Sequence, residues 1–423
     1  MIRMLGPAIF AAFCCAAFAL SLRTGIPYGW MNAFSLAAGS VSLVAMSLCL
    51  ALAARPRFLE PIFGGLDRMY FYHKWLGITA LGMLLLHDLT EPHFQRWVRE
   101  TALGEIGEGL GEFAYYGLVV LILFSWIKRI PVIEWEIPYQ LWWFSHRLTG
   151  AFFALASLHQ LLVDTPFRSG DPLLILLNVT AAIGIACYVF IEFIAARWRR
   201  RAYRVDDLRI EAGATHLALS PFGRAMRWRP GQFAFLSAPA AGLSEPHPFT
   251  IAGQVAPDNG VRFIIKPLGD WTRRLPERLQ PGTAVAVEGP YGRFNFRAGG
   301  RRQIWIAGGV GITPFLAWVQ SLSSDEDRRV HLFYCLRAQT EAIGLDILRD
   351  AATNLAGFSF ELVVSERGKR LDADHVVANA PFDIGAADLF FCGPTNLRSA
   401  ILSGLKSRGI APRRVHFELF EFR

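Results

Sequence analysis

Four histidines lie in two pairs inside strongly apolar stretches of the chain. His73 and His87 are fourteen residues apart, and His146 and His159 are thirteen residues apart. An ionisable residue in a membrane segment is costly and is a candidate functional site, and imidazole is a common iron ligand. Two such pairs on two membrane helices predict two haems stacked across a bilayer, and therefore a protein that conducts electrons.

The two pairs differ in how their histidines are placed around an ideal helix. Fourteen residues rise about 21 Å and return to within about 40° of the same helical face, whereas thirteen residues end about 140° out of phase. The second helix is therefore either distorted, for example near Gly150, or presents its two rings from different sides. The alternative role is hydrogen bonding to backbone carbonyls or between the histidines. Two matched pairs favour haem, and a bis-histidine haem favours electron transfer over ligand activation.

A second group of motifs lies in the part of the chain after Arg197. An aromatic strand that ends in a hydroxyl, HPFTIAG at His247–Gly253, suits a flat flavin with a polar edge. The stretch IKPLGDWT at Ile265–Thr272 offers backbone N–H groups, a hydroxyl and a cation to a pyrophosphate. The residues that we assign to this cofactor are His247, Pro248, Phe249, Thr250, Ile251, Lys266, Gly269, Trp271 and Thr272.

Two glycine motifs follow predicted strands nearer the C-terminus. GGVGITP at Gly308–Pro314 lets the backbone approach a phosphate, although it is not the G-x-G-x-x-G fingerprint. Cys392-Gly-Pro394 follows a later strand, at the carboxyl edge where doubly wound sheets bind ligands. The residues that we assign to a dinucleotide are Gly308, Gly309, Gly311, Thr313, Pro314, Cys392, Gly393 and Pro394.

The composition divides the chain into an apolar half and a polar half. Of the 423 residues, 53% are hydrophobic and 18% are charged, and the mean hydropathy is +0.31. Apolar runs dominate up to about Ala196, whereas the remainder has the charges and turns of a water-soluble protein. The net charge of +8 clusters beside apolar runs, which indicates positive-inside topology. We therefore expect membrane lipid, and not nucleic acid, as a partner.

Six apolar segments approach the ~20 residues that a membrane span requires. They cover Leu5–Leu22, Met31–Ala53, Met69–Leu89, Phe113–Trp126, Leu141–Val163 and Leu173–Ala195. The first segment also resembles a signal peptide, but no clear small-residue cleavage site precedes Arg23. Basic loops after the second, fourth and sixth segments place both termini in the cytoplasm. His73 and His146 then lie near the cytoplasmic face, and His87 and His159 lie nearer the outer face.

The polar half predicts two domains. From Arg204 to Arg297, short alternating strands such as Gln232–Leu236, Val261–Ile265 and Ala284–Glu288 predict a small antiparallel barrel. From about Arg301, alternating strands and helices predict a doubly wound parallel sheet. Its strands are expected at Gln303–Ala307, Val330–Cys335, Phe358–Val364, Asp388–Phe391 and Val415–Glu418. The six cysteines form no CxxC and no regular framework, so we expect no disulfide and no zinc site.

These motifs, in this order, resemble the NADPH oxidase and ferric reductase superfamily over nearly the whole chain. The resemblance implies a six-helix transmembrane haem-binding bundle (1–196), an antiparallel β-barrel FAD domain (204–298) and a ferredoxin reductase-like α/β NADPH domain (299–423). It pairs His73 with His146 on an inner haem b and His87 with His159 on an outer one. It also matches Phe152 to an aromatic side chain between the haems.

The resemblance also implies roles for residues of the polar half. Thr250 would hydrogen-bond the flavin, and Lys266 and Thr272 would hold its phosphates. Cys392 would lie near the nicotinamide. The ending Phe420–Arg423 resembles the family's C-terminus, where an aromatic covers the flavin; we expect Phe422 in this role, with Phe420 second. The expected catalytic residues are Thr250, Cys392 and Phe422.

Two arginines bear on the choice of coenzyme. Arg337 follows the second strand of the predicted sheet and Arg367 follows the third, where a 2′-phosphate could bind. They favour NADPH, with NADH as the alternative donor.

The function implied is electron transfer from cytoplasmic NADPH through FAD and two haems to an external acceptor. Oxygen, giving superoxide, is the leading acceptor, although the arginine that animal oxidases carry early in the second helix is missing from Met31–Ser35. A ferric chelate is one alternative. A haem relay to a periplasmic protein is another, with Glu100, Glu105 and Glu108 in the docking loop. We expect an integral protein of a bacterial inner membrane with no obligatory protein partner.

Overall fold

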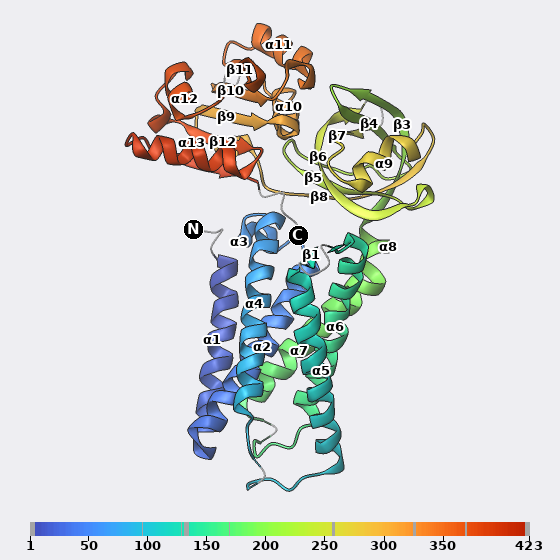
Figure 1. The fold of residues 1–423 in the computed structure, drawn as a ribbon, viewed down its shortest axis with the longest axis vertical. Helices are drawn as coiled ribbons and strands as arrows, with labels where there is room; N and C mark the ends of the chain where they lie inside the picture. The colour runs from blue at the N-terminus through green and yellow to red at the C-terminus, as the bar shows by residue number, and fades with distance from the viewer. Residues whose placement is uncertain are drawn as a thin grey trace. The chain divides into compact units, whose positions relative to one another are not determined.

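The chain forms two compact units, Met1–Trp198 and Arg199–Arg423, and each is described by itself. The computed structural model describes residues 5–94, 96–127, 129–130, 135–168, 170–255, 259–324, 327–368 and 370–418. Figure 1 shows a helical first unit and a second unit in which a barrel is followed by a sheet flanked by helices. The expected order of a helical bundle, an antiparallel barrel and a parallel sheet is confirmed.

Six long helices build the first unit within the described residues. They are α1 (Leu5–Gly25), α2 (Trp30–Ala53), α4 (Leu66–Thr90), α5 (Ala102–Trp126), α6 (Tyr139–Leu162) and α7 (Pro172–Val189). The last continues through a π-helical turn, η3 (Phe190–Ile194), into α8 (Ala195–Arg199). Shorter pieces are η2 (Ile26–Tyr28), α3 (Glu60–Phe63) and the paired strands β1 (Arg129–Ile130) and β2 (Trp135–Glu136).

Four of the described helices are long and apolar enough to cross a membrane. These spans are Leu5–Tyr28, Trp30–Ala53, Ala102–Trp126 and Pro172–Arg199. The histidine-bearing helices α4 and α6 are as long but less apolar, since they carry charged residues such as Lys74 and Arg147 beside their histidines. The sequence predicted six spans, and hydropathy supports four of them among the described helices. Helices α4 and α6 pack against α2 and α5, and their crossing of the membrane stays a prediction.

One local expectation about the helices is wrong, and one of two open alternatives is excluded. Helix α5 begins at Ala102, eleven residues before the predicted Phe113, because Thr101 caps it: the Thr101 hydroxyl accepts a hydrogen bond from the Gly104 amide at 3.1 Å. Part of the supposed acidic loop is therefore helix, and Glu105 in its first turn complements the helix dipole. Helix α6 runs without interruption through Gly150, so the predicted distortion is not there.

Small residues bring the helices of the first unit close together. A Cβ on Gly25 would lie 2.5 Å from the Ala33 Cα atom, and one on Gly107 would lie 2.9 Å from the Val163 amide nitrogen. Glycine removes the side chain where two backbones approach, which is how helices associate in an apolar environment. Helix α2 packs chiefly against α4, and α5 packs chiefly against α6. The two histidine helices are therefore each supported by a different neighbour.

A closed six-stranded antiparallel barrel opens the second unit. Its strands are β3 (Arg200–Glu211), β4 (Ala214–Pro221), β5 (Phe233–Ala238), β6 (Leu243–Val255), β7 (Gly260–Ile265) and β8 (Ala284–Tyr291), in the order β3-β4-β7-β6-β5-β8. The interior is apolar, with Leu217, Phe263 and Val287 fully buried. Helix α9 (Asp270–Arg278) adds Trp271 and Leu275 to this core.

A five-stranded parallel sheet follows the barrel. The strands β9 (Arg302–Gly308), β10 (Arg329–Leu336), β11 (Phe358–Val364), β12 (Asp388–Cys392) and β13 (Arg414–Phe417) lie in the order β11-β10-β9-β12-β13. The helices are α10 (Thr313–Val319), α11 (Leu345–Asn354), α12 (Ala373–Asn379) and α13 (Thr395–Ser407). Alternate residues of β9 feed two separate cores, Trp305 on one face and Ile304 and Ile306 on the other. From β9 the chain adds β10 and β11 on one side and then β12 and β13 on the other, so the strand order reverses between β9 and β12. Ligands of such sheets bind at that point.

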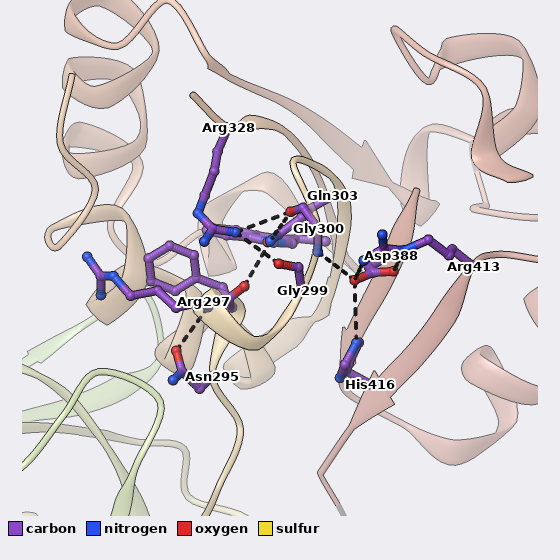
Figure 2. Close-up of polar contacts among 11 residues, drawn as sticks. Asn295, Arg297, Gly299, Gly300, Gln303, Arg328, Asp388, Arg413 and His416 are labelled. Atoms are coloured by element: carbon purple, nitrogen blue, oxygen red, sulfur yellow. Dashed lines mark hydrogen bonds and ion pairs between the residues drawn. The ribbon is translucent and has the colours of Figure 1, made fainter. Parts of the chain in front are cut away.

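A polar network fixes the segment that links the barrel to the sheet (Figure 2). The buried Asp388 carboxylate accepts hydrogen bonds from Arg413 Nε at 2.8 Å and from the Gly300 amide at 2.7 Å. Arg328 donates to the carbonyls of Gly299 and Gly300, each at 3.2 Å. Burial alone would raise the pKa of Asp388, but the Arg413 guanidinium and the Gly300 N–H outweigh it and hold the pKa below its usual value. The network closes the amino edge of the sheet, opposite the edge where ligands bind.

Candidate functional site

The structure brings two of the four membrane histidines together. His73 is the eighth residue of α4 and His146 is the eighth residue of α6. Their ring centroids are 5.9 Å apart, with 73° between the ring planes. The Trp142 ring stacks on His146 at 5.3 Å and limits its rotation. His87 and His159 lie in the last turns of the same two helices.

Each of the four imidazole rings has its Nδ1 atom held by a neighbouring helix. The Nδ1 atom of His73 is 3.0 Å from the Cys49 carbonyl oxygen, and that of His87 is 2.9 Å from the Ser35 carbonyl oxygen, both on α2. On the other side of the bundle, α5 holds the rings of α6. His159 Nδ1 is 2.9 Å from the Gly107 carbonyl oxygen, and His146 Nδ1 is 3.0 Å from the Ser125 hydroxyl.

These contacts decide which ring nitrogen is available to a metal. A carbonyl oxygen only accepts, so the rings that face carbonyls carry their proton on Nδ1. The Ser125 hydroxyl donates to the Leu121 carbonyl at 2.8 Å, so its oxygen is also an acceptor for His146. Each Nε2 atom then keeps its lone pair, and a metal-bound histidine typically has this kind of second partner. The donor set therefore fits two bis-histidine haems.

Two glycines make room for the outer rings. A Cβ on Gly111 of α5 would lie 2.4 Å from His159 Nδ1, and one on Gly39 of α2 would lie 3.0 Å from the His87 ring. Phe152 is placed in the same way, because a Cβ on Gly117 would lie 2.0 Å from its ring. The sequence motifs do not reveal these glycines, since they lie on helices without a histidine.

An ion pair lies one residue beyond His146. Arg147 Nε donates to Glu192 Oε1 at 2.9 Å, and Arg147 Nη2 is paired with Glu192 Oε2. The guanidinium also lies 4.1 Å from the centroid of the Trp143 ring. Glu192 sits in the π-helical turn η3, and such turns often occur at functional positions. The two charged residues inside apolar segments were a signal of this pair, which the sequence reasoning missed.

The predicted flavin strand is β6, and it is partly accessible. His247, Pro248 and Phe249 are half-buried, whereas Thr250 and Ile251 are buried. Trp271 packs against this strand, with ring centroids 4.6 Å from His247 and 5.6 Å from Phe249. Burial lowers the pKa of His247, and Glu245 at 3.4 Å partly offsets that effect. The strand thus presents an aromatic and imidazole surface, with Trp271 as part of the barrel core.

Two of the predicted phosphate-binding side chains bond to other groups of the protein. Lys266 Nζ forms an ion pair with Glu341 Oε2 at 2.6 Å, and so joins the barrel to the sheet domain. The Thr272 hydroxyl accepts a hydrogen bond from the Gly269 amide at 2.9 Å and caps α9. In this structure Lys266 and Thr272 are thus engaged within the protein, and only the exposed start of α9 at Gly269 is open.

The two glycine motifs of the sheet domain do meet. Cys392 of β12 is paired with Ala307 of β9, so the loops that follow both strands leave the same edge of the sheet. A Cβ on Gly311 would lie 2.3 Å from the Cys392 carbonyl oxygen, and one on Gly308 would lie 2.6 Å from Pro394 Cδ. Gly309 and Gly393 have φ angles of 56° and 156°, which favour glycine. These loops interlock at the point where the sheet reverses its strand order.

Other members of these motifs support the loops from within. The Thr313 hydroxyl donates to the Val310 carbonyl at 3.1 Å, and Thr313 and Pro314 are both buried in α10. Gly393 and Pro394 are exposed at the start of α13. The edge therefore offers the partly accessible backbone of residues 308–310 and the α13 N-terminus to a ligand, while the buried Gly311, Thr313 and Pro314 act in packing.

A thiol and a carboxylate lie beneath this edge. Cys392 is 2% exposed, and burial, with a further contribution from Glu418, raises the pKa of its thiol. Glu418 is 9% exposed, and a Cβ on Gly292 of the barrel would lie 2.9 Å from its Oε1 atom. Glu418 thus joins Cys392 to the barrel, and no motif in the sequence marked it.

The two arginines that were predicted to bear on the choice of coenzyme follow neighbouring strands, β10 and β11. Arg337 follows β10 and is exposed, and its Nε atom is 3.4 Å from Glu366 Oε1. Glu366 belongs to the turn η8 (Ser365–Arg367). The Glu366 amide donates a hydrogen bond to the Arg337 carbonyl at 3.1 Å. Arg367 is in that turn, but its side chain lies outside the described residues, as do Phe420 and Phe422.

Three known families match consecutive parts of the chain. They are the ferric reductase like transmembrane component at residues 38–157, an FAD-binding domain at 212–295 and an oxidoreductase NAD-binding domain at 305–401. The matches thus place a segment similar to a ferric reductase transmembrane component before segments similar to FAD-binding and NAD-binding domains, in the order of the helical unit, the barrel and the parallel sheet. The order of the three matches agrees with the resemblance to the NADPH oxidase and ferric reductase superfamily that the sequence motifs gave.

Similar proteins include reductase components of oxygenases and a ferric reduction oxidase. The reductase component of propane 2-monooxygenase from Rhodococcus jostii is 27% identical over 240 residues, 52% of this chain and 63% of that protein. Ferric reduction oxidase 7 (chloroplastic) from Arabidopsis thaliana is 27% identical over 274 residues, 58% of this chain and 34% of that protein. The chain spans 58–63% of the length of the oxygenase reductase and electron transfer components that it matches.

One solved structure aligns with nearly the whole chain. The flavohemoglobin from Malassezia yamatoensis, with bound FAD and heme, has a TM-score of 0.51 and 17% identity. The alignment covers 95% of this chain and 98% of that chain. This likeness concerns the fold alone.

Proposed function

We propose that this protein carries electrons from NADPH across a membrane to an external acceptor, by way of FAD and two haems b. The observation that carries the proposal is the common state of the four membrane histidines. Each has Nδ1 occupied by a neighbouring helix and Nε2 left to bind iron. NADH is the alternative donor.

The helical unit would hold the haems in fixed positions. His73 and His146 would bind the inner haem, and His87 and His159 the outer one, with helices α2 and α5 orienting the rings. Haem bound in this way would supply one-electron carriers inside the membrane. The Phe152 side chain, placed by Gly117, lies on α6 between its two histidines.

The second unit would bind the donor and the flavin. The half-buried part of β6 would hold the flavin, with the Thr250 hydroxyl as a hydrogen-bonding group. FAD, when bound, converts a two-electron donor into one-electron steps. The loops at Gly308–Gly311 and Gly393–Pro394 would hold the dinucleotide at the switch point of the sheet. Arg337 would have to leave Glu366 to bind a 2′-phosphate.

Positive-inside topology supports cytoplasmic termini and a cytoplasmic donor site. Both pairs of haem ligands then lie in helices that run outward, so the acceptor site is external. No obligatory protein partner is needed for this reaction, and an external relay partner would dock on the α5 end that carries Glu105 and Glu108.

Oxygen, giving superoxide, is the acceptor that we propose first. A ferric chelate is the second candidate, and a specific observation favours it: the membrane part matches a ferric reductase family, and one relative is a ferric reduction oxidase. The two candidates predict different behaviour in the presence of superoxide dismutase.

The purified protein in nanodiscs provides the test. We expect a haem absorption spectrum, and NADPH-dependent cytochrome c reduction that superoxide dismutase abolishes. Dismutase-insensitive reduction of ferric citrate under argon would favour iron. His87→Ala should remove the outer haem and leave flavin reduction by NADPH intact, while His93→Ala, in the loop after α4, serves as the matched control. A colourless protein would refute the proposal.

A further inference from the structure

One exposed aromatic side chain stands out on the second unit. Phe222 follows β4 and is 78% exposed, the largest value among the described hydrophobic residues of that unit. Gly223 after it has a φ angle of 99°, so the chain turns sharply there.

Arginines surround Phe222 without acidic neighbours in the sequence. Arg224, Arg227 and Arg229 are exposed, and no Asp or Glu occurs from residue 212 to residue 244. Among the residues that the structure describes, these three arginines form no ion pair. We call the segment Phe222–Arg229 the basic loop.

The basic loop is held in one shape by inward contacts. The Met226 amide donates to the Tyr203 hydroxyl at 2.8 Å, and the Met226 side chain is 2% exposed. Trp228 packs on the barrel core, and the Arg229 amide donates to Gln232 Oε1 at 2.9 Å. Because Met226 and Trp228 point inward, Phe222 and the arginines are displayed outward on a fixed scaffold.

Chain continuity limits the distance between this loop and the end of a candidate membrane span. The span Pro172–Arg199 leads directly into β3, and Trp198, which is 78% exposed, is suited to the lipid headgroup level. Ala202 is four residues beyond Trp198, so the two Cα atoms are at most about 14 Å apart. The Phe222 amide donates to the Ala202 carbonyl at 2.8 Å. Phe222 is thus hydrogen-bonded to Ala202, which is only four residues along the chain from Trp198 in the candidate span.

The sequence around that point is strongly basic, although Arg199 lies 4.0 Å from Glu288 and Arg204 lies 3.6 Å from Asp206 in the structure. Arg197, Arg199, Arg200, Arg201 and Arg204 follow one another with no Asp or Glu from residue 193 to residue 205. Basic residues close to an anionic bilayer bind it through its surface potential, and an aromatic side chain inserts at the headgroup level.

We propose that the basic loop is a lipid-binding site that takes the phosphate headgroups of anionic phospholipids, with Phe222 inserted among them. The site would anchor the barrel at the membrane surface. It depends on the span ending at Arg199 and not on haem, flavin or turnover, so it stands or falls separately from the proposed function.

Hydrogen–deuterium exchange of the full-length protein in nanodiscs tests the site. We compare discs of phosphatidylcholine with discs of equal parts phosphatidylcholine and phosphatidylglycerol. Amides of residues 222–229 should exchange more slowly in the anionic discs, by about fivefold for each arginine engaged. Molar salt should remove the difference, since it shortens the screening length to about 3 Å.

Paired variants separate a charge effect from a folding effect. R224E/R227E should lose the lipid-dependent protection, while R349E/K406E, which reverses two exposed charges elsewhere on the unit, should keep it. R224Q/R227Q replaces the first variant if charge reversal lowers the thermal midpoint. Equal exchange in both lipids would overturn the proposal. So would protection retained in R224Q/R227Q, or protection that appears only when an acidic peptide is added.

Discussion

Gly111→Ala is the sharpest test of how the outer histidine is held. The added Cβ would lie 2.4 Å from His159 Nδ1 and 2.8 Å from Cε1 of the same ring. Non-bonded heavy atoms prefer about 3.5 Å, so the ring has to move by roughly 1 Å. That movement would break its hydrogen bond to the Gly107 carbonyl, which is 2.9 Å long now.

The size of the effect follows from the role of that hydrogen bond. Losing the second partner of a metal-bound histidine typically lowers metal affinity about 10- to 100-fold, or roughly 1.4–2.7 kcal/mol. We expect G111A to lose much of its outer haem and to retain the inner haem and the flavin. The assay is the haem-to-protein ratio of purified protein, with flavin content measured on the same sample.

The same helix offers a matched control. Gly109 is also on α5, but a Cβ there would meet nothing within 4 Å. G109A should keep both haems and gain up to about 1 kcal/mol of helix stability. G39A should fall between the two, because its Cβ would lie 3.0 Å from the His87 ring. If G111A keeps its full haem content and an unaltered spectrum, the ring is not a ligand held as we describe.

Three other predictions test separate parts of the molecule. Arg147→Met leaves Glu192 without its partner inside the helical unit, so we expect the free energy of unfolding to fall by roughly 3 kcal/mol. The double variant R147M/E192M should recover most of this loss in thermal unfolding, and a single variant as stable as the wild type would contradict the prediction. Asp388→Asn should unfold more easily in denaturant at pH 7. Since the folded pKa of Asp388 lies below its usual value, the wild type should lose this advantage as the pH falls below about 4, while the variant changes less; parallel pH profiles would refute this. Gly311→Ala places a Cβ 2.3 Å from the Cys392 carbonyl oxygen. It should abolish flavin reduction by NADPH without loss of flavin or haem, and reduction at the wild-type rate would show that this loop does not bind the coenzyme.

Periodicity and turn chemistry carried much of the fold prediction. The parallel strands begin and end within about one residue of their predicted limits, because a buried strand is a short apolar run between turn residues. The predicted start of α5 was eleven residues too late, because its first turns are rich in glycine and glutamate and show no apolar run. The helix begins there because Thr101 caps it and the Thr101 amide donates a hydrogen bond to the Asp164 carboxylate. Asp164 is 63 residues away in the sequence, and no local pattern encodes that contact.

The candidate site divides in the same way. Residue type and spacing selected the histidines and the glycine loops. The sequence did not show that Lys266 pairs with Glu341, which is 75 residues away, or that Glu366 lies beside Arg337. The binding roles of all these residues stay predictions.

By itself the sequence determined the kinds of chemistry available: imidazoles in apolar helices, a flavin-type strand and phosphate-type loops. Only the tertiary structure decided how those groups are oriented. The Nδ1 partners of the four histidines come from α2 and α5, helices that carry none of the four, and Gly111 matters solely because His159 lies against it. Such contacts join residues 21 to 52 positions apart, and their geometry is set by helix packing, which residue spacing along one helix does not specify.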